Sequence, residues 1–147
     1  LIINEKVYKS KSLVAKFNKS NNTLTKNSPK FTWPAKGTVI KSFGKFGKGQ
    51  YYDGIDIKLG VNRPIYSAYD GKIAFIGSQI KKFGNLILVK HNDGWLSAYS
   101  NVGKYNVKKG DIIKKGEIIA FTSSDSESFH FQLRYNRTPV NPVNYLN

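Results

Sequence analysis

Apolar and polar residues alternate most regularly near the end of the chain, between residues 128 and 134. In an extended strand, successive side chains point to opposite faces, so this stretch separates into an apolar and a polar set. The apolar set is Phe129, Phe131 and Leu133, and the polar set is Ser128, His130, Gln132 and Arg134. The pattern predicts a strand with its apolar face in the core and its polar face at an accessible surface.

Short runs typical of β-strands, separated by turn residues, follow one another from residue 31 onward. They cover residues 37–43, 55–57, 64–68, 72–76, 85–91, 95–102 and 117–121. The dipeptides Asp70-Gly71 and Asp93-Gly94 are typical of hairpin turns. No stretch has the period of a long amphipathic helix. Together these features predict an all-β, mostly antiparallel fold.

The glycine-rich segment 44–49 contains lysines but lacks the Gly-Lys-Ser/Thr ending of a phosphate-binding loop, and no helical period follows it. We therefore expect no nucleotide site there. We interpret the segment as a flexible loop at the rim of the fold that leads into Tyr51 and Tyr52.

Composition divides the 147 residues into two parts. Residues 1–30 are rich in Lys, Ser, Asn and Thr, and we expect a polar basic arm or linker there, whereas residues 31–147 are predicted to form one folded domain. No run approaches the roughly 20 apolar residues of a membrane span. The chain starts at Leu1 without a signal peptide, so we expect a fragment of a longer protein, with any membrane anchor outside it.

The charge and composition of the chain exclude some kinds of site and favour some kinds of partner. Cysteine is absent, which excludes disulfides and cysteine-based sites, and there are only two histidines. The net charge of +15 favours anionic partners. No nucleic-acid-binding motif is present, so we expect a solvated basic surface and no nucleic-acid partner.

Several motifs resemble those of the lysostaphin-type (LytM) zinc endopeptidases, which cut peptidoglycan cross-bridges. That family has a His-x-x-x-Asp motif, a Tyr-x-His motif and a closing His-x-His strand. The resemblance places the metal-ligand positions on Tyr52, Asp56 and His130, and the two catalytic histidine positions on Asn101 and Ser128. Only two of the five positions keep the family residue.

The resemblance extends from about residue 33 to residue 146. It includes segments 70–73, 82–93, 95–99, 107–120 and 129–135. It implies a two-sheet, sandwich-like antiparallel core with a groove across one sheet.

These replacements predict a chain that is not an enzyme and has no cofactor. Asp56 and His130 would supply two of the three protein ligands that a catalytic zinc needs. Tyr52 would have to bind as a phenolate, although its ordinary pKa is near 10. Asn101 and Ser128 cannot act as proton donors or acceptors at neutral pH, as an imidazole can. We expect His91 to be a structural turn histidine, and Asp53 and Asp93 to be turn acids.

Within the family, the motifs are most similar to those of the wall-hydrolase activators of the NlpD and EnvC type. That resemblance implies a domain that binds and activates an N-acetylmuramoyl-L-alanine amidase during septal wall splitting. It also implies the periplasm or envelope of a Gram-negative bacterium, at the division site. In such activators the groove engages a helical segment of the amidase or its regulator. A metal-free peptidoglycan-binding module and a residual zinc endopeptidase are the alternatives.

The expected binding groove combines the two vestigial ligand positions with nearby aromatic, polar and arginine side chains, the types that often dominate interfaces. Ordinary core packing is the alternative for its aromatic members. The predicted groove residues are Tyr51, Tyr52, Asp56, Trp95, Tyr99, Asn101, Ser128, His130, Gln132 and Arg134.

Overall fold

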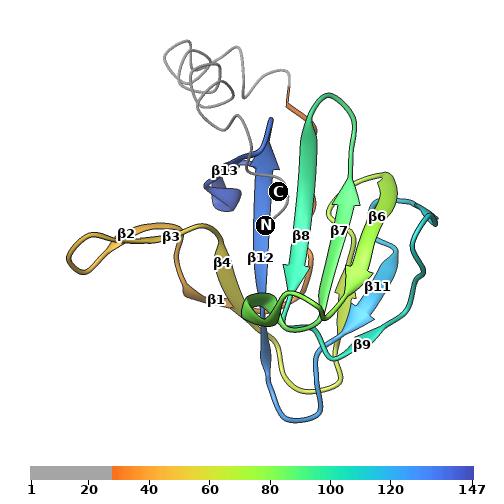
Figure 1. Ribbon diagram of the computed structural model, residues 1–147, viewed down its shortest axis with the longest axis horizontal. Coiled ribbons are helices and arrows are strands. Elements are labelled where there is room, and N and C mark those ends of the chain that lie inside the picture. Colours follow the sequence, from red (N-terminus) through yellow and green to blue (C-terminus); the bar gives the residue numbers. More distant parts are fainter. Residues whose placement is uncertain (1–27) are drawn as a thin grey trace.

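Residues 128–135 form strand β12 (Ser128–Tyr135), as their alternating pattern predicted, and this strand lies inside the largest sheet (Figure 1). We describe residues 28–147 from a computed structural model, so the predicted arm lies outside the described residues except for its last three. Within this part of the chain, the regular structure consists of strands and two short 3-10 turns. The other elements are β1 (Thr38–Lys41), β2 (Gly44–Phe46), β3 (Gln50–Tyr52), β4 (Ile55–Lys58), β5 (Pro64–Tyr66), β6 (Gly71–Gly77), η1 (Lys81–Phe83), β7 (Leu86–Lys90), β8 (Trp95–Ser100), β9 (Lys104–Tyr105), β10 (Ile112–Ile113), β11 (Ile118–Phe121), β13 (Thr138–Val140) and η2 (Pro142–Asn144). The predicted all-β, antiparallel fold is confirmed.

The large sheet has the strand order β1-β4-β12-β8-β7-β6-β10, and its neighbouring strands are antiparallel. One edge of β12 pairs with β8. The other edge is divided, because residues 128–131 pair with β4 and residues 133–135 pair with β13. β12 therefore joins both halves of the sheet.

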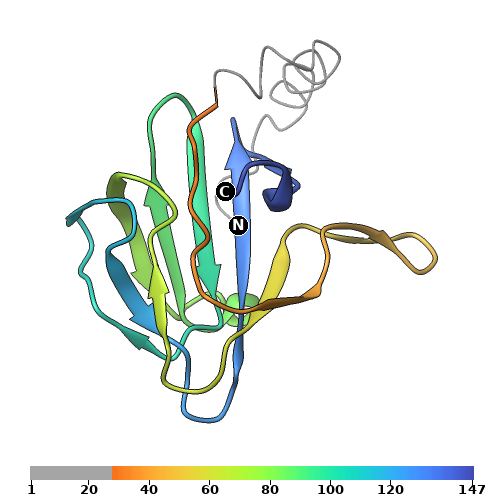
Figure 2. The same cartoon turned by 180° about the vertical axis from the view of Figure 1, so that it is seen from behind.

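A smaller sheet, β5-β11-β9, covers part of the inner face of the large one (Figure 2). Between them lies the main hydrophobic core, which includes the apolar set of β12: Phe129, Phe131 and Leu133 are at most 1% exposed. A second, smaller cluster on the outer face of the large sheet centres on Leu86, Leu88 and Ala98.

The segment expected to be a rim loop instead contributes to a β-hairpin. Strands β2 and β3 form a two-stranded sheet of their own in which Gly44 pairs with Tyr52. Gly47 and Gly49 have positive φ, of 61° and 68°, so glycine allows the tight reversal between the strands. The hairpin projects from the body of the molecule (Figures 1 and 2).

Of the two predicted hairpin turns, one is confirmed. Asp93 and Gly94 both have positive φ, of 57° and 84°, and they connect the paired strands β7 and β8. The prediction for Asp70-Gly71 is wrong, because that dipeptide connects strands in different sheets: β5 pairs with β11, and β6 pairs with β7 and β10.

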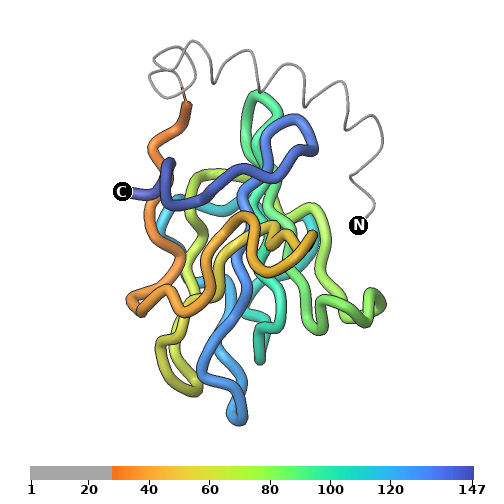
Figure 3. Tube along the Cα trace, turned by 90° about the vertical axis from the view of Figure 1, so that its left-hand side faces the viewer, coloured from red at the N-terminus to blue at the C-terminus, as the bar shows by residue number. Residues whose placement is uncertain are grey.

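The two ends of the described chain meet. Phe31 forms an isolated parallel bridge with Leu146, and the backbone N–H of Asn147 donates to the Phe31 carbonyl at 2.9 Å (Figure 3). The Phe31 ring is fully buried and contacts Tyr69, His91 and Trp95. Residues 28–147 contain no helix with the length and apolar character to span a membrane.

Candidate functional site

A cleft of about 640 Å³ lies beside β12, on the face of the large sheet that carries the polar set of that strand. We use "the cleft" for the space lined by Tyr51, Tyr52, Asp53, Asp56, Lys81, Lys82, Phe83, Gly84, Ser100, Asn101, Ser128, Phe129, His130, Gln132 and Arg134. Eight of the ten predicted groove residues are among these fifteen. Their part in binding remains a prediction.

Trp95 and Tyr99 do not line the cleft, so the prediction that they are groove residues is wrong. Both belong to the main core, with exposures of 2% and 0%. The reason is strand register: Tyr99 is directly opposite Phe131 and contacts its ring, with centroids 5.3 Å apart. Tyr99 therefore shares the apolar face of β12, and Trp95 lies four residues away on the same face.

The opposite face of β8 borders the cleft. Ser100 is paired with His130, and Ala98 with Gln132. Asp56 of β4 is paired with His130 from the other side. Strand pairing thus brings Asp56, His130 and Ser100 into one row across three strands.

One oxygen of Asp56 is the centre of the site. Its Oδ1 accepts a hydrogen bond from the Tyr52 hydroxyl at 2.7 Å, and the Nδ1 atom of His130 lies 2.7 Å from the same oxygen. The Tyr52 ring also meets the His130 ring edge-on, with centroids 4.9 Å apart. The sequence predicted Asp56 and His130 as neighbours, and the tyrosine hydroxyl completes a three-residue cluster.

These contacts shift the pKa values of Tyr52 and Asp56. Burial raises the pKa of Tyr52 well above its ordinary value, and the hydrogen bond and negative charge of Asp56 raise it further. Burial also pushes the pKa of Asp56 upward, but hydrogen bonds from His130 and Tyr52, with the charges of His130 and Lys41, outweigh it. The pKa of Asp56 is therefore lowered, and the pair is a carboxylate beside a neutral phenol.

The hydrogen bonds continue along the polar face of β12. Arg134 Nη1 donates to Gln132 Oε1 at 2.7 Å, and Gln132 Nε2 lies 3.2 Å from His130 Nε2. Arginine has only donors, so Gln132 must turn its oxygen toward Arg134 and its NH₂ group toward His130. His130 Nε2 must then accept, which leaves the ring proton on Nδ1, where it is donated to Asp56.

Arg134 is the buried end of this chain of hydrogen bonds. It is 7% exposed, and its Nη2 atom donates to the carbonyl of Arg137 at 3.2 Å. Burial lowers its pKa, while the charge of Asp53 acts in the opposite direction. Arg134 therefore orients Gln132 from within the fold and presents little surface to a partner.

Gly54 allows β4 to approach β12 at this point. A Cβ atom at residue 54 would contact the carbonyl oxygen of Phe131 and would lie 2.8 Å from His130 Nε2. Any larger residue would have to displace the histidine or the strand, so the glycine is needed for close packing.

The zinc ion implied by the sequence resemblance does not fit these residues. Asp56 and His130 are the only two conventional ligands in the cluster, and they are bonded to each other. Tyr52 is held as a phenol, whereas a metal ligand must be deprotonated. Within residues 28–147, no three His, Cys, Asp or Glu side chains are grouped so as to hold a metal ion.

Several residues at the cleft were missed by sequence reasoning. Lys81, Lys82 and Phe83 come from η1, which is joined to the end of β8 by a hydrogen bond from the Asn101 N–H to the Phe83 carbonyl at 2.8 Å. Nothing in the local sequence indicates that η1 lies at the cleft, because its place beside β12 depends on the pairing of β8 with β12. Ser100 was predictable, since it alternates with Tyr99 and faces away from the core.

His91 lies outside the cleft, and the structure agrees with the expected structural role. It is 5% exposed; its Nδ1 atom is 2.6 Å from the Asp70 carbonyl oxygen and its Nε2 atom is 2.8 Å from Ser97 Oγ. Ser97 Oγ is in turn 2.8 Å from the Tyr99 hydroxyl, which accepts from the Ala68 N–H. This buried network joins β8 and the end of β7 to residues 68–70, in the connection between β5 and β6.

Comparisons with known proteins agree with the fold. The chain is 41% identical over 124 residues to "Cell division protein DipM" of Caulobacter vibrioides, covering 78% of the chain and 20% of that protein. It is 38% identical over 117 residues to "Murein hydrolase activator NlpD" of Escherichia coli, covering 78% of the chain and 30% of that protein. The chain thus spans less than a third of the length of either relative.

Among solved structures, lysostaphin in solution aligns with a TM-score of 0.70 and 26% identity, covering 82% of this chain and 57% of that one. The model of the family described as "Peptidase family M23" matches residues 50–142, which include the hairpin strand β3, the cleft and β12. The chain therefore belongs to peptidase family M23, the family of LytM domains.

Proposed function

We propose that this chain is a non-catalytic LytM domain that binds an N-acetylmuramoyl-L-alanine amidase and activates it during cell division. Two observations of different kinds support this. Relatives over the same region are named a cell division protein and a murein hydrolase activator. At the position of the family's metal site, Tyr52 and His130 are both hydrogen-bonded to Asp56, and this observation carries the proposal.

Loss of catalysis follows from the residues at the cleft. A hydrolase of this family would need a metal to activate water and an imidazole to move protons. Asn101 and Ser128, at the two catalytic positions, have no group that titrates near neutral pH. Loss of general acid–base catalysis alone typically lowers a rate by about 10²–10⁴-fold.

The cleft still has features suited to recognition. Tyr51 is 59% exposed at one side, while Phe83 with the exposed Lys81 and Lys82 forms another side. Such a mixture of aromatic and cationic groups suits a helical segment of the amidase, or of a regulator of the amidase, whose apolar face lies in the cleft. We place this event in the periplasm or envelope of a Gram-negative bacterium, at the division site.

The test is amidase-dependent release of dye from labelled wall sacculi. The purified chain should release no dye alone and should increase release by a purified N-acetylmuramoyl-L-alanine amidase. The variant Lys81→Glu/Lys82→Glu should lose stimulation, whereas Lys108→Glu/Lys109→Glu, with the same charge change at exposed positions outside the cleft, should keep it.

Other outcomes identify the alternatives. Sedimentation of the chain with sacculi, without stimulation of any cognate amidase, would indicate a metal-free peptidoglycan-binding module. Chelator-sensitive dye release by the chain alone would indicate a surviving zinc endopeptidase.

A further inference from the structure

The β2–β3 hairpin and the adjacent strand β1 expose large apolar side chains to solvent. Phe46 is 42% exposed and Tyr51 59% exposed, and Ile40 in the adjacent strand β1 is 55% exposed. Among the described residues, the hairpin strands pair only with each other, so both outer backbone edges lack a strand partner. Exposed apolar groups on a projecting hairpin with open edges are typical of a binding surface.

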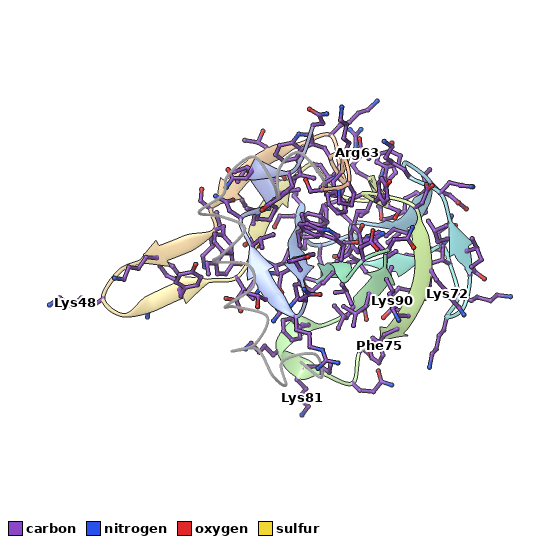
Figure 4. The ribbon with its side chains drawn as sticks, turned by 90° about the horizontal axis from the view of Figure 1, so that it is seen from above. Lys48, Arg63, Lys72, Phe75, Lys81 and Lys90 are labelled. Carbon is purple, nitrogen blue, oxygen red and sulfur yellow. The ribbon has the colours of Figure 1, made fainter. Side chains whose placement is uncertain are left out.

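The hairpin and the end of β1 that leads into it are basic. Residues 41–52 contain Lys41, Lys45 and Lys48 and no acidic residue. All three lysines are exposed, and Figure 4 shows Lys48 at the tip of the hairpin, far from Lys72 and Lys90. No acidic residue within residues 41–52 therefore balances the charge of these lysines.

The arrangement of the aromatic rings in and beside the hairpin makes this surface more positive. Phe46 and Tyr52 meet edge to face, as do Phe43 and Tyr51, with interplanar angles of 87° and 84°. Lys41 Nζ lies 4.2 Å from the Tyr52 centroid and 5.0 Å from the Phe46 centroid. Because ring faces are negative and ring edges positive, the lysine covers faces and adds a positive charge beside them.

This surface is continuous with the cleft, because Tyr51 and Tyr52 belong to both. A molecule in the cleft that extends past these tyrosines would meet Phe46 and Lys45 next. A sugar ring would need a free aromatic face on which to stack. A peptide with carboxylates and apolar side chains fits this surface better, because its carboxylates can contact the lysine ammonium groups and the ring edges while its apolar side chains pack on Phe46.

We propose that the β2–β3 hairpin is a docking arm for an acidic segment, with apolar residues, of the partner polypeptide whose other part lies in the cleft. This inference rests on the proposed function and specifies the chemistry of the partner. The arm supplies long-range attraction through its lysines and contact area through Phe46 and Tyr51.

The test compares two double variants of the full chain with equal charge change. The arm variant is Lys45→Gln/Lys48→Gln, and the control is Lys72→Gln/Lys90→Gln, at exposed positions away from the cleft. Binding to the purified amidase is measured by titration calorimetry at about 0.1 M and about 0.5 M salt. The arm variant should bind about tenfold more weakly than the control at low salt, and the difference should shrink at high salt. Phe46→Ser should weaken binding at both salt concentrations.

Each outcome is decisive. If wild type stimulates the amidase and both double variants bind equally, the arm proposal is wrong and the proposed function stands. If the arm variant loses binding to sacculi but not to the amidase, the arm recognises wall polymer and the proposal is also wrong. If wild type neither binds nor stimulates the amidase, the proposed function fails and the arm proposal fails with it. Melting temperatures identify any loss of fold.

Discussion

At the scale of single residues, the site depends on which atoms share the Asp56 carboxylate. Two donors, the Tyr52 hydroxyl and His130 Nδ1, contact the same oxygen at 2.7 Å. Hydrogen bonds to a charged acceptor are among the stronger ones in proteins, and each contributes about 1.5–3 kcal/mol. Two strong hydrogen bonds thus hold the three side chains of this cluster together.

We expect that Tyr52→His will restore zinc binding. An imidazole at this position would complete a set of one aspartate and two histidines, the number of protein ligands that a zinc site requires. Elemental analysis should give about one zinc per chain for this variant. Addition of zinc should raise its melting temperature, and a chelator should reverse that rise.

The matched control is Tyr52→Phe, which removes the hydroxyl without adding a ligand and should bind no zinc. Tyr52→His should remain inactive on sacculi, because Asn101 and Ser128 still occupy the catalytic positions. Zinc bound to the wild-type chain at one ion per molecule would contradict this account of the site.

At the scale of elements, the sequence predicts strands better than it predicts their partners. The alternation in residues 128–134 correctly separated the core and polar faces of β12. Trp95 and Tyr99 were assigned to the wrong side because their own strand, with five of its six residues buried, does not reveal its register against β12. The lysines of η1 were missed for the same reason: their place beside β12 is set by pairing between strands distant in sequence.

The buried network around His91 predicts a dependence of stability on pH. Burial lowers the pKa of His91, and the hydrogen bond to the Asp70 carbonyl and the charge of Asp70 only partly oppose this. The unfolded chain, with an ordinary histidine pKa near 6.5, then binds more protons than the folded chain. The stability that neutral, buried His91 contributes is fully present above about pH 6.5. It is lost as the pH falls from there through the pKa of His91 in the folded chain.

Thermal unfolding of wild type between pH 8 and pH 5 should therefore show a falling melting temperature. His91→Gln should be less stable at pH 8, because its side chain cannot keep both hydrogen bonds in place, and should lose less stability on acidification. His130 is present in both proteins, so the difference between them isolates His91. Parallel pH profiles would show that His91 does not carry the effect.

At the scale of the whole molecule, most of the positive charge is left available to a partner. The ion pairs of the described residues include Lys58–Glu127, at 3.6 Å and more than half exposed, whereas His130 and Asp56 form an ion pair only when the His130 ring is protonated. Several other acids instead accept hydrogen bonds from backbone N–H groups, including Asp70, Asp111 and Glu117. The net charge of +15 therefore generates a field that favours encounter with anionic proteins.

We expect the association rate with the amidase to fall about tenfold or more between about 0.05 M and about 0.5 M salt. The dissociation rate should change much less, because screening acts mainly on the approach of the two proteins. Stopped-flow fluorescence measures both rates. An association rate independent of salt would mean that the positive charge of the chain does not steer this encounter.

The meeting of Phe31 with Leu146 has a consequence for protein engineering. Neighbouring parallel strands lie about 4.8 Å apart, so entry to and exit from the domain are separated by about that distance. A domain built in this way can be inserted into a surface loop of a carrier protein without distortion of either partner. It also suits circular permutation, with a short linker across the old ends and new ends opened at Asp93-Gly94.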